Sequence, residues 1–119
     1  MRETTWIIGL LIGALILHLI EEIKAGFRQR FPLGVMPLPL FVVINVGVYA
    51  FCFATLIASA RQGALATPFA WLFAVTMFLN GLGHVAVMLV RRRYFPGGVT
   101  ASLLLVLSGY LLFQLTGIG

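Results

Sequence analysis

Charged side chains are scarce in this 119-residue sequence, and acidic side chains are the scarcest, with 3 residues against 8 lysines and arginines. Only 9% of the chain is charged, whereas about a quarter of a soluble domain is charged. Hydrophobic residues make up 61% of the chain, so too little polar surface is left to cover a folded domain in water. The composition therefore excludes an ordinary soluble domain and predicts an integral membrane protein.

Other scarce features narrow the class of protein. The single cysteine, Cys52, excludes a disulfide within the chain, and its apolar neighbours predict a small buried side chain. The net charge of +5 does not predict nucleic-acid binding, because the basic residues form short clusters between apolar runs. We expect no cleavable signal peptide, since Glu21, Glu22 and Lys24 follow the first apolar run in place of a small-residue cleavage site.

Long hydrophobic runs are what the sequence does contain. Four of them are near the roughly 20 residues that a helix needs to cross a bilayer core. They are residues 4–23, 39–60, 68–90 and 99–118. Helices are expected because backbone groups in lipid must be hydrogen-bonded within their own segment. The sequence thus predicts an all-α fold, an integral membrane four-helix bundle whose four transmembrane helices form one domain over residues 1–119.

The basic residues predict the orientation of this bundle. Six of the 8 lie in two loops, 24–36 and 91–98, and the other two are Arg2 and Arg61 at the opposite ends of the spans. Because lysine and arginine concentrate in cytoplasmic loops, we expect both basic loops in the cytoplasm and both termini on the non-cytoplasmic side. The expected surroundings are the lipid bilayer of a bacterial inner membrane.

The only two histidines are expected at the same depth in the membrane. His18 precedes Lys24 by six residues, which places it about 9 Å below the surface at 1.5 Å per residue. His84 precedes Arg91 by seven residues, which places it about 10 Å below the same surface. Two spans far apart in the chain therefore bring both imidazoles to one level.

Further polar residues are expected beside these histidines. Helical spacing of three and four residues puts Glu21 and Glu22 on the face of His18, and the four-residue spacing favours Glu22 as the more inward. Ionisable groups at such depth normally face the bundle interior, where they pair or line a polar cavity. We therefore expect a pocket open toward the cytoplasmic leaflet. Its expected residues are His18, Glu21, Glu22, His84 and Asn80, joined by Asn45 and Tyr49 from the second span.

Each of these residues also has an ordinary structural explanation. Glu21 and Glu22 suit a membrane interface at which Lys24 and Arg28 neutralise them. His84 suits a structural hydrogen bond to a neighbouring polar side chain. The convergence of both histidines and two of the 3 acids on one level favours a site over these separate explanations.

Three short motifs resemble the signatures of the HXXEE family of small multi-pass membrane proteins. They are HLIEE at residues 18–22, the second histidine His84, and YFPG at residues 94–97. The resemblance supplies no activity, because the family is named for its residues. It does imply that the motif residues act as one set, with Tyr94, Pro96 and Gly97 at the cytoplasmic rim of the pocket.

The candidate site is compatible with two kinds of enzyme acting on a lipophilic substrate from the membrane. Two imidazoles and carboxylates are ligands for zinc or non-haem iron, which makes His18, Glu21, Glu22 and His84 both candidate metal ligands and candidate catalytic residues. The same residues without a metal provide an acid and a base, as isomerase- or cyclase-like chemistry requires.

Two functions other than catalysis remain open at this point. A membrane glutamate can support a proton-coupled small-molecule transporter, although here Glu21 and Glu22 lie close to one end of a span. The polar cluster can also hold helices together in a structural, assembly or binding subunit. Four short helices bury little area, so a homodimer is a further expectation.

Overall fold

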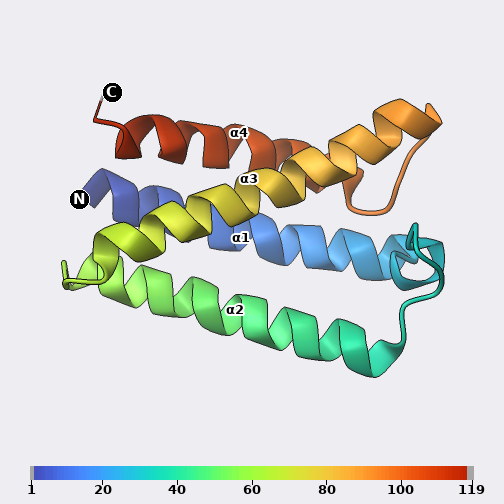
Figure 1. Cartoon of the computed structure of the whole chain (residues 1–119), viewed down its shortest axis with the longest axis horizontal. Helices are drawn as coiled ribbons and strands as arrows, with labels where there is room; N and C mark the ends of the chain where they lie inside the picture. The colour runs from blue at the N-terminus through green and yellow to red at the C-terminus, as the bar shows by residue number, and fades with distance from the viewer. Residues whose placement is uncertain (1, 118–119) are drawn as a thin grey trace.

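The fold consists of helices joined by short connections, as seen in a computed structural model that describes residues 2–117 (Figure 1). No strand occurs within those residues. The elements in chain order are α1 (Arg2–Ala25), the 3₁₀ helix η1 (Arg28–Arg30), α2 (Leu38–Ala60), α3 (Ala66–Arg91) and α4 (Gly98–Leu115). The predicted all-α fold with four long helices is confirmed.

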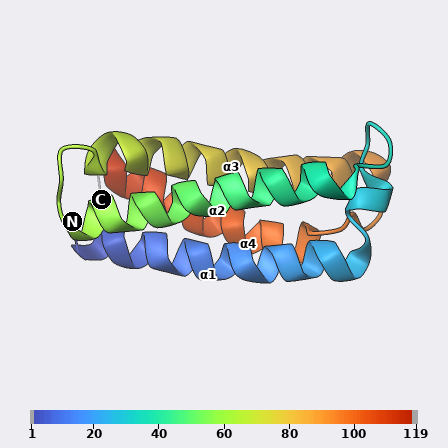
Figure 2. The same cartoon turned by 90° about the horizontal axis from the view of Figure 1, so that it is seen from below.

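The four helices form an antiparallel bundle in which each helix packs against the next, and α4 closes the ring against α1 (Figures 1 and 2). The start of α1, the end of α4 and the α2–α3 connection share one end of the bundle. The α1–α2 connection and the α3–α4 connection lie together at the other end. This second end therefore joins the loops that carry the basic clusters.

All four helices are long and apolar enough to span a membrane. The shortest, α4, has 18 residues and is about 27 Å long at 1.5 Å per residue. Large apolar side chains point outward along the bundle, including Val43, Leu79 and Val106, which are more than half exposed. An apolar outer surface of this kind is suited to lipid rather than to water.

The observed helices agree with the expected spans apart from their ends. The expected spans 4–23, 39–60 and 68–90 all lie inside longer helices. The fourth span was expected over 99–118, but α4 ends at Leu115, where the chain turns through Thr116 and the left-handed Gly117. Residue 118 lies outside the described residues, as do residues 1 and 119.

Apolar packing fills the half of the bundle near the chain ends. Fully buried side chains from α1, α3 and α4 meet there, among them Ile8, Leu11, Phe73, Leu104 and Leu111. Cys52 of α2 is also buried and free, as its apolar neighbours predicted. The buried polar side chains of this half, Thr4, Thr55, Ser59 and Ser108, are all hydroxyl residues, whereas both histidines and the buried Glu22 lie in the opposite half.

The most extensive helix contact, between α3 and α4, depends on Gly81. A Cβ atom at this position would lie 2.8 Å from the backbone oxygen of Ala101 and 2.9 Å from the backbone nitrogen of Leu105. Backbone atoms cannot rotate away, so any side chain would force α4 to move. Glycine at residue 81 thus sets how closely the helix that carries His84 approaches α4.

We expect Gly81→Ala to lower the unfolding free energy by about 2 kcal/mol, as overpacking of a tight contact does. Gly83, one half-turn away on the same helix, is the matched control because a Cβ there meets nothing within 4 Å. Denaturant unfolding in detergent micelles provides the measurement. Equal stability of the Gly81→Ala and Gly83→Ala variants would contradict the close α3–α4 contact.

Candidate functional site

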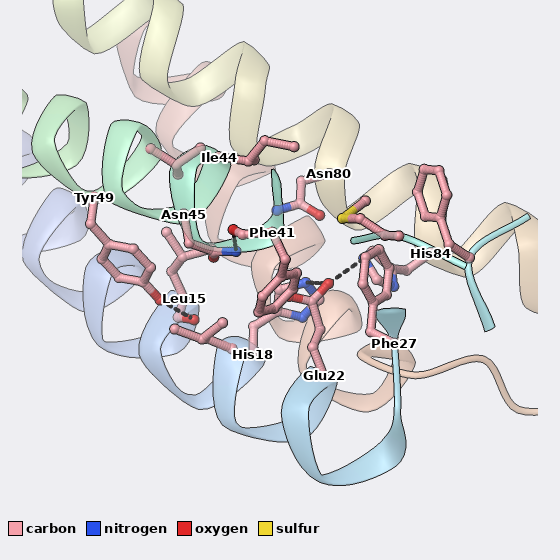
Figure 3. Close-up of a pocket in the computed structure, with 14 residues that line it drawn as sticks. Leu15, His18, Glu22, Phe27, Phe41, Ile44, Asn45, Tyr49, Asn80 and His84 are labelled. Atoms are coloured by element: carbon pink, nitrogen blue, oxygen red, sulfur yellow. Dashed lines mark hydrogen bonds and ion pairs between the residues drawn. The ribbon is translucent and has the colours of Figure 1, made fainter. Parts of the chain in front are cut away.

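One carboxylate and two imidazoles meet at the end of the bundle that carries the basic loops (Figure 3). His18 and Glu22 are one turn apart on α1, and His84 comes from α3. The Oε2 atom of Glu22 lies 3.4 Å from the Nε2 atom of His18 and 3.4 Å from the Nε2 atom of His84. The two imidazole rings touch edge to face, with their centroids 4.6 Å apart. We call these three residues the His/Glu cluster.

The His/Glu cluster is almost closed to the surroundings. His18, Glu22 and His84 are 2%, 8% and 7% exposed. Two of the buried ring nitrogens, Nε2 of His18 and Nδ1 of His84, have no hydrogen-bond partner among the described residues. An unsatisfied buried polar atom costs about 1–3 kcal/mol, so a ligand that binds such an atom stabilises the fold.

Glu21 has a different position from its neighbour Glu22. Its carboxylate accepts hydrogen bonds from the backbone N–H groups of Val99 and Thr100, at 3.2 and 2.8 Å, and from the hydroxyl groups of Tyr94 and Thr100. These N–H groups belong to the first turn of α4. N–H groups in the first turn of a helix have no acceptor within the helix. Glu21 therefore caps α4 and ties it to α1.

Thr100 links the capping glutamate to the His/Glu cluster. Its hydroxyl lies 2.7 Å from Oε1 of Glu21 and 2.8 Å from Nδ1 of His18. An ionised carboxylate only accepts, so the hydroxyl donates to Glu21 and accepts from His18. The proton of a neutral His18 is then on Nδ1, and the lone pair of Nε2 is directed at the cluster.

The segment between α3 and α4 covers the two histidines. Gly97 has φ +92°, and a Cβ atom there would lie 2.7 Å from a ring carbon of His18 and 2.7 Å from one of His84. Phe95 is buried, and the centroid of its ring lies 5.4 Å from the centroid of the His84 ring. Pro96 is fully buried as well. The backbone at Gly97 therefore lies directly against both imidazoles.

Tyr94 holds this covering segment to α1 through its hydrogen bond to Glu21. Partial burial and the adjacent Glu21 carboxylate raise the pKa of the Tyr94 phenol. The phenol is therefore protonated at neutral pH and donates to Glu21.

A cavity of about 290 Å³ extends from the His/Glu cluster toward the middle of the bundle, between α1, α2 and α3 (Figure 3). His18, Glu22 and His84 form one wall. Most of the remaining lining is apolar, namely Leu15, Leu19, Phe27, Phe31, Met36, Phe41, Ile44 and Val48. A polar wall thus adjoins a mostly apolar chamber.

Three polar residues expected in the pocket do line this cavity. Tyr49 donates a hydrogen bond from its hydroxyl to the backbone oxygen of Leu15, and Asn45 donates one to the backbone oxygen of Phe41. Asn80 is half-buried at the cavity wall. The side-chain oxygens of Asn45 and Asn80 offer polar contacts to a molecule in the chamber.

The structure brings together the residues of all three motifs but separates the two glutamates. Glu22 joins His18 and His84, whereas Glu21 bonds to Tyr94 and to the start of α4. Sequence reasoning missed Thr100, although a hydroxyl three residues after the YFPG motif was a usable signal. Two aromatic side chains beside His84 were also missed. Phe95 lies inside the YFPG motif, and Phe27 lies five residues after the HLIEE motif.

Residues 9–112 match the model of a family described as "protein of unknown function with HXXEE motif". The chain belongs to the HXXEE family. The match covers most of the chain and confirms the resemblance seen in the motifs. Comparisons with curated proteins and with solved structures each found no significant match.

In the structure, the residues of the HXXEE motif make two separate sets of contacts from one turn of α1. The histidine and the second glutamate of the motif, His18 and Glu22, face the cavity. The first glutamate, Glu21, faces α4. The YFPG motif then supplies Tyr94 to Glu21 and the glycine that fits against both imidazoles.

Proposed function

We propose that this HXXEE protein is a metal-dependent intramembrane enzyme whose metal ligands are His18, Glu22 and His84 and whose substrate is lipophilic. The observation that carries the proposal is the meeting of two imidazole nitrogens at one carboxylate oxygen, each 3.4 Å away, at the wall of an apolar cavity. One ligand-type atom from each of the three residues lies within 4.8 Å of the others.

The donor set fits zinc or ferrous iron. Metal–ligand distances of about 2.0–2.1 Å around a tetrahedral ion place neighbouring donor atoms roughly 3.3 Å apart, close to the observed 3.4 Å contacts. Direct hydrogen bonds of nitrogen to oxygen are typically about 2.9 Å, so these contacts are long for bonds without an ion. The lone pair on Nε2 of His18 also lacks a hydrogen-bond partner among the described residues.

Two histidines and one carboxylate leave coordination positions open, so a bound ion would supply a Lewis acid for a water, a dioxygen or a substrate oxygen. Thr100 and Glu21 hold the ring of His18 in the tautomer that presents Nε2 to the cluster. The rings of Phe27 and Phe95 pack against the ring of His84, with centroids 5.5 and 5.4 Å away, and Phe27 also lines the cavity. Glu21 is thus a positioning residue in this proposal, not a ligand.

The surroundings of the His/Glu cluster favour a substrate that arrives from lipid. A second hollow of about 320 Å³ between α1 and α2 shares Glu22, Phe27 and Phe41 with the main cavity. Its outer lining includes apolar side chains that are about half exposed or more, namely Ile23, Leu38 and Val42. This mostly apolar hollow, whose lining also includes Arg28 and Gln29, gives a hydrocarbon chain a route to Glu22.

The membrane setting completes the proposal. We place the chain in a bacterial inner membrane with loops 24–36 and 91–98 in the cytoplasm and both termini on the other side. The unequal distribution of basic residues supports this orientation. A homodimer stays a prediction, as does the absence of nucleic-acid binding.

Comparison of membrane lipids provides the test of enzymatic function. Lipid extracts of cells that produce the parent protein or the His84→Ala variant are compared by untargeted mass spectrometry. We expect one lipophilic species to accumulate with His84→Ala and to disappear when purified, metal-loaded parent protein is added to the extract. Thr76→Val is the control, because this exposed hydroxyl bonds only to its own helix.

Identical lipid profiles for all three proteins, together with normal folding of His84→Ala, would contradict an enzyme and leave an assembly role. Uptake into liposomes that depends on a pH gradient and on Glu22 would instead favour the transporter.

A further inference from the structure

A third hollow, separate from the His/Glu cluster, lies against the segment that covers the histidines. Its volume is about 350 Å³, and its lining is Arg30, Arg91, Arg93, Tyr94, Phe95 and Pro96. Arg30 comes from the α1–α2 connection, while the other residues come from the end of α3 and the segment after it. We call it the arginine pocket. It shares no lining residue with the main cavity.

The arginine pocket concentrates positive charge without a matching acid. Within residues 2–117, none of its three arginines forms an ion pair with a carboxylate. The one nearby carboxylate, Glu21, is engaged by Tyr94, Val99 and Thr100. Three guanidinium groups around one hollow repel one another, and an anion among them offsets that repulsion.

The backbone gathers these arginines rather than leaving them spread around a helix. Arg92 ends α3 in the left-handed conformation, with φ +54°, so the helix stops between Arg91 and Arg93. Both of these side chains then line one hollow, together with Arg30 from a connection more than 60 residues earlier in the sequence. A cluster built from two segments far apart in the sequence is more specific than a run of basic residues at a helix end.

We propose that the arginine pocket binds an anionic phosphate group. The planar guanidinium group donates paired hydrogen bonds that match phosphate oxygens, which a lysine cannot do. The pocket is lined by residues at or just after the ends of α1 and α3, and a lipid phosphate would lie at that level in a membrane. The same chemistry suits a soluble phosphorylated compound, so the headgroup of an anionic lipid and a free phosphate are the two sources to separate.

The test uses the full-length, metal-free protein in nanodiscs of neutral phosphatidylcholine, so its result does not depend on the proposed metal. Thermal stability is measured with phosphatidic acid titrated into the bilayer, or with inorganic phosphate titrated into the buffer. We expect at least one of these probes to stabilise the parent protein. The double variant Arg91→Gln, Arg93→Gln is expected to weaken the apparent affinity about tenfold or more.

Two controls separate a built site from general charge attraction. Arg61→Gln removes one exposed arginine at the C-terminal end of α2, at the opposite end of the bundle, and is expected to leave the affinity unchanged. Arg91→Lys with Arg93→Lys keeps the charge but loses the paired donors, so its affinity is expected to lie between those of the parent and the Gln variant. If the double variant does not fold, Arg30→Gln in the α1–α2 connection provides the same test.

The outcomes decide the proposal and the source of the phosphate. Stabilisation by phosphatidic acid alone identifies a lipid headgroup, and stabilisation by inorganic phosphate identifies a soluble ligand. The proposal is overturned if neither probe stabilises the protein, or if Arg61→Gln weakens binding as much as the pocket variants do. Equal stabilisation by oleate, whose head is a carboxylate, would also overturn it.

Discussion

Gly97→Ala is expected to push apart the imidazoles of His18 and His84 and to abolish metal binding. The new Cβ atom would lie 2.7 Å from a ring carbon of each histidine, so both rings must move. The backbone at residue 97 also has φ +92°, where a side chain is strained. Together, overpacking and backbone strain predict a loss of about 3 kcal/mol in unfolding free energy.

Gly34→Ala is the matched control for this substitution. Gly34 has φ +112° in the α1–α2 connection, but a Cβ atom there meets nothing within 4 Å. The control therefore carries the backbone strain without the clash, and we expect about 1 kcal/mol of destabilisation with metal binding retained. Denaturant unfolding and metal content measured on both variants check the pair. Retention of the metal by Gly97→Ala would contradict the contact between Gly97 and the histidines.

Glutamine substitutions of the two adjacent glutamates are expected to have opposite effects. Glu21→Gln replaces an oxygen acceptor by an amide group next to N–H and O–H donors at the start of α4, so about 2 kcal/mol of stability is lost. Glu22→Gln removes a buried carboxylate that no lysine or arginine neutralises among the described residues, so metal-free stability stays the same or rises.

We expect Glu22→Gln to weaken metal binding more than Glu21→Gln does, which is the reverse of their effects on stability. Glu22→Gln loses the anionic ligand and is expected to lose the metal. Glu21→Gln keeps all three ligands and is expected to lower the affinity by no more than about 10–100-fold, the usual cost of a lost supporting hydrogen bond. Unfolding is measured on metal-free protein and affinity by metal titration. Parallel effects of the two substitutions on both quantities would contradict the separate roles of Glu21 and Glu22.

Much of the fold could be predicted from the sequence because lipid leaves the backbone only internal hydrogen bonds. Long apolar runs therefore had to be helices, and the basic clusters marked their ends. The common depth of His18 and His84 followed from their distances along the chain to Lys24 and Arg91. That depth estimate placed both histidines at one level, and the rings are in contact.

Which glutamate contacts His84 and which contacts α4 could not be predicted from the sequence. Positions three and four residues after His18 are about 100° apart around a helix, and both lie near its face. Which one meets His84 depends on where α3 and α4 pack against α1. That packing is set by close contacts, such as Gly81 against α4, which helical periodicity does not describe. The part played by Thr100 depends on the same packing.

The metal content of the purified protein tests the central claim most directly. The protein is prepared in detergent, loaded with zinc or with ferrous iron under anaerobic conditions, and analysed by inductively coupled plasma mass spectrometry. We predict one tightly bound ion per chain in the parent protein, with loss of that ion in the His18→Ala and His84→Ala variants and retention in Thr76→Val. Failure of the parent protein to hold either metal, or equal metal content in all four proteins, would contradict a metal site at His18, Glu22 and His84.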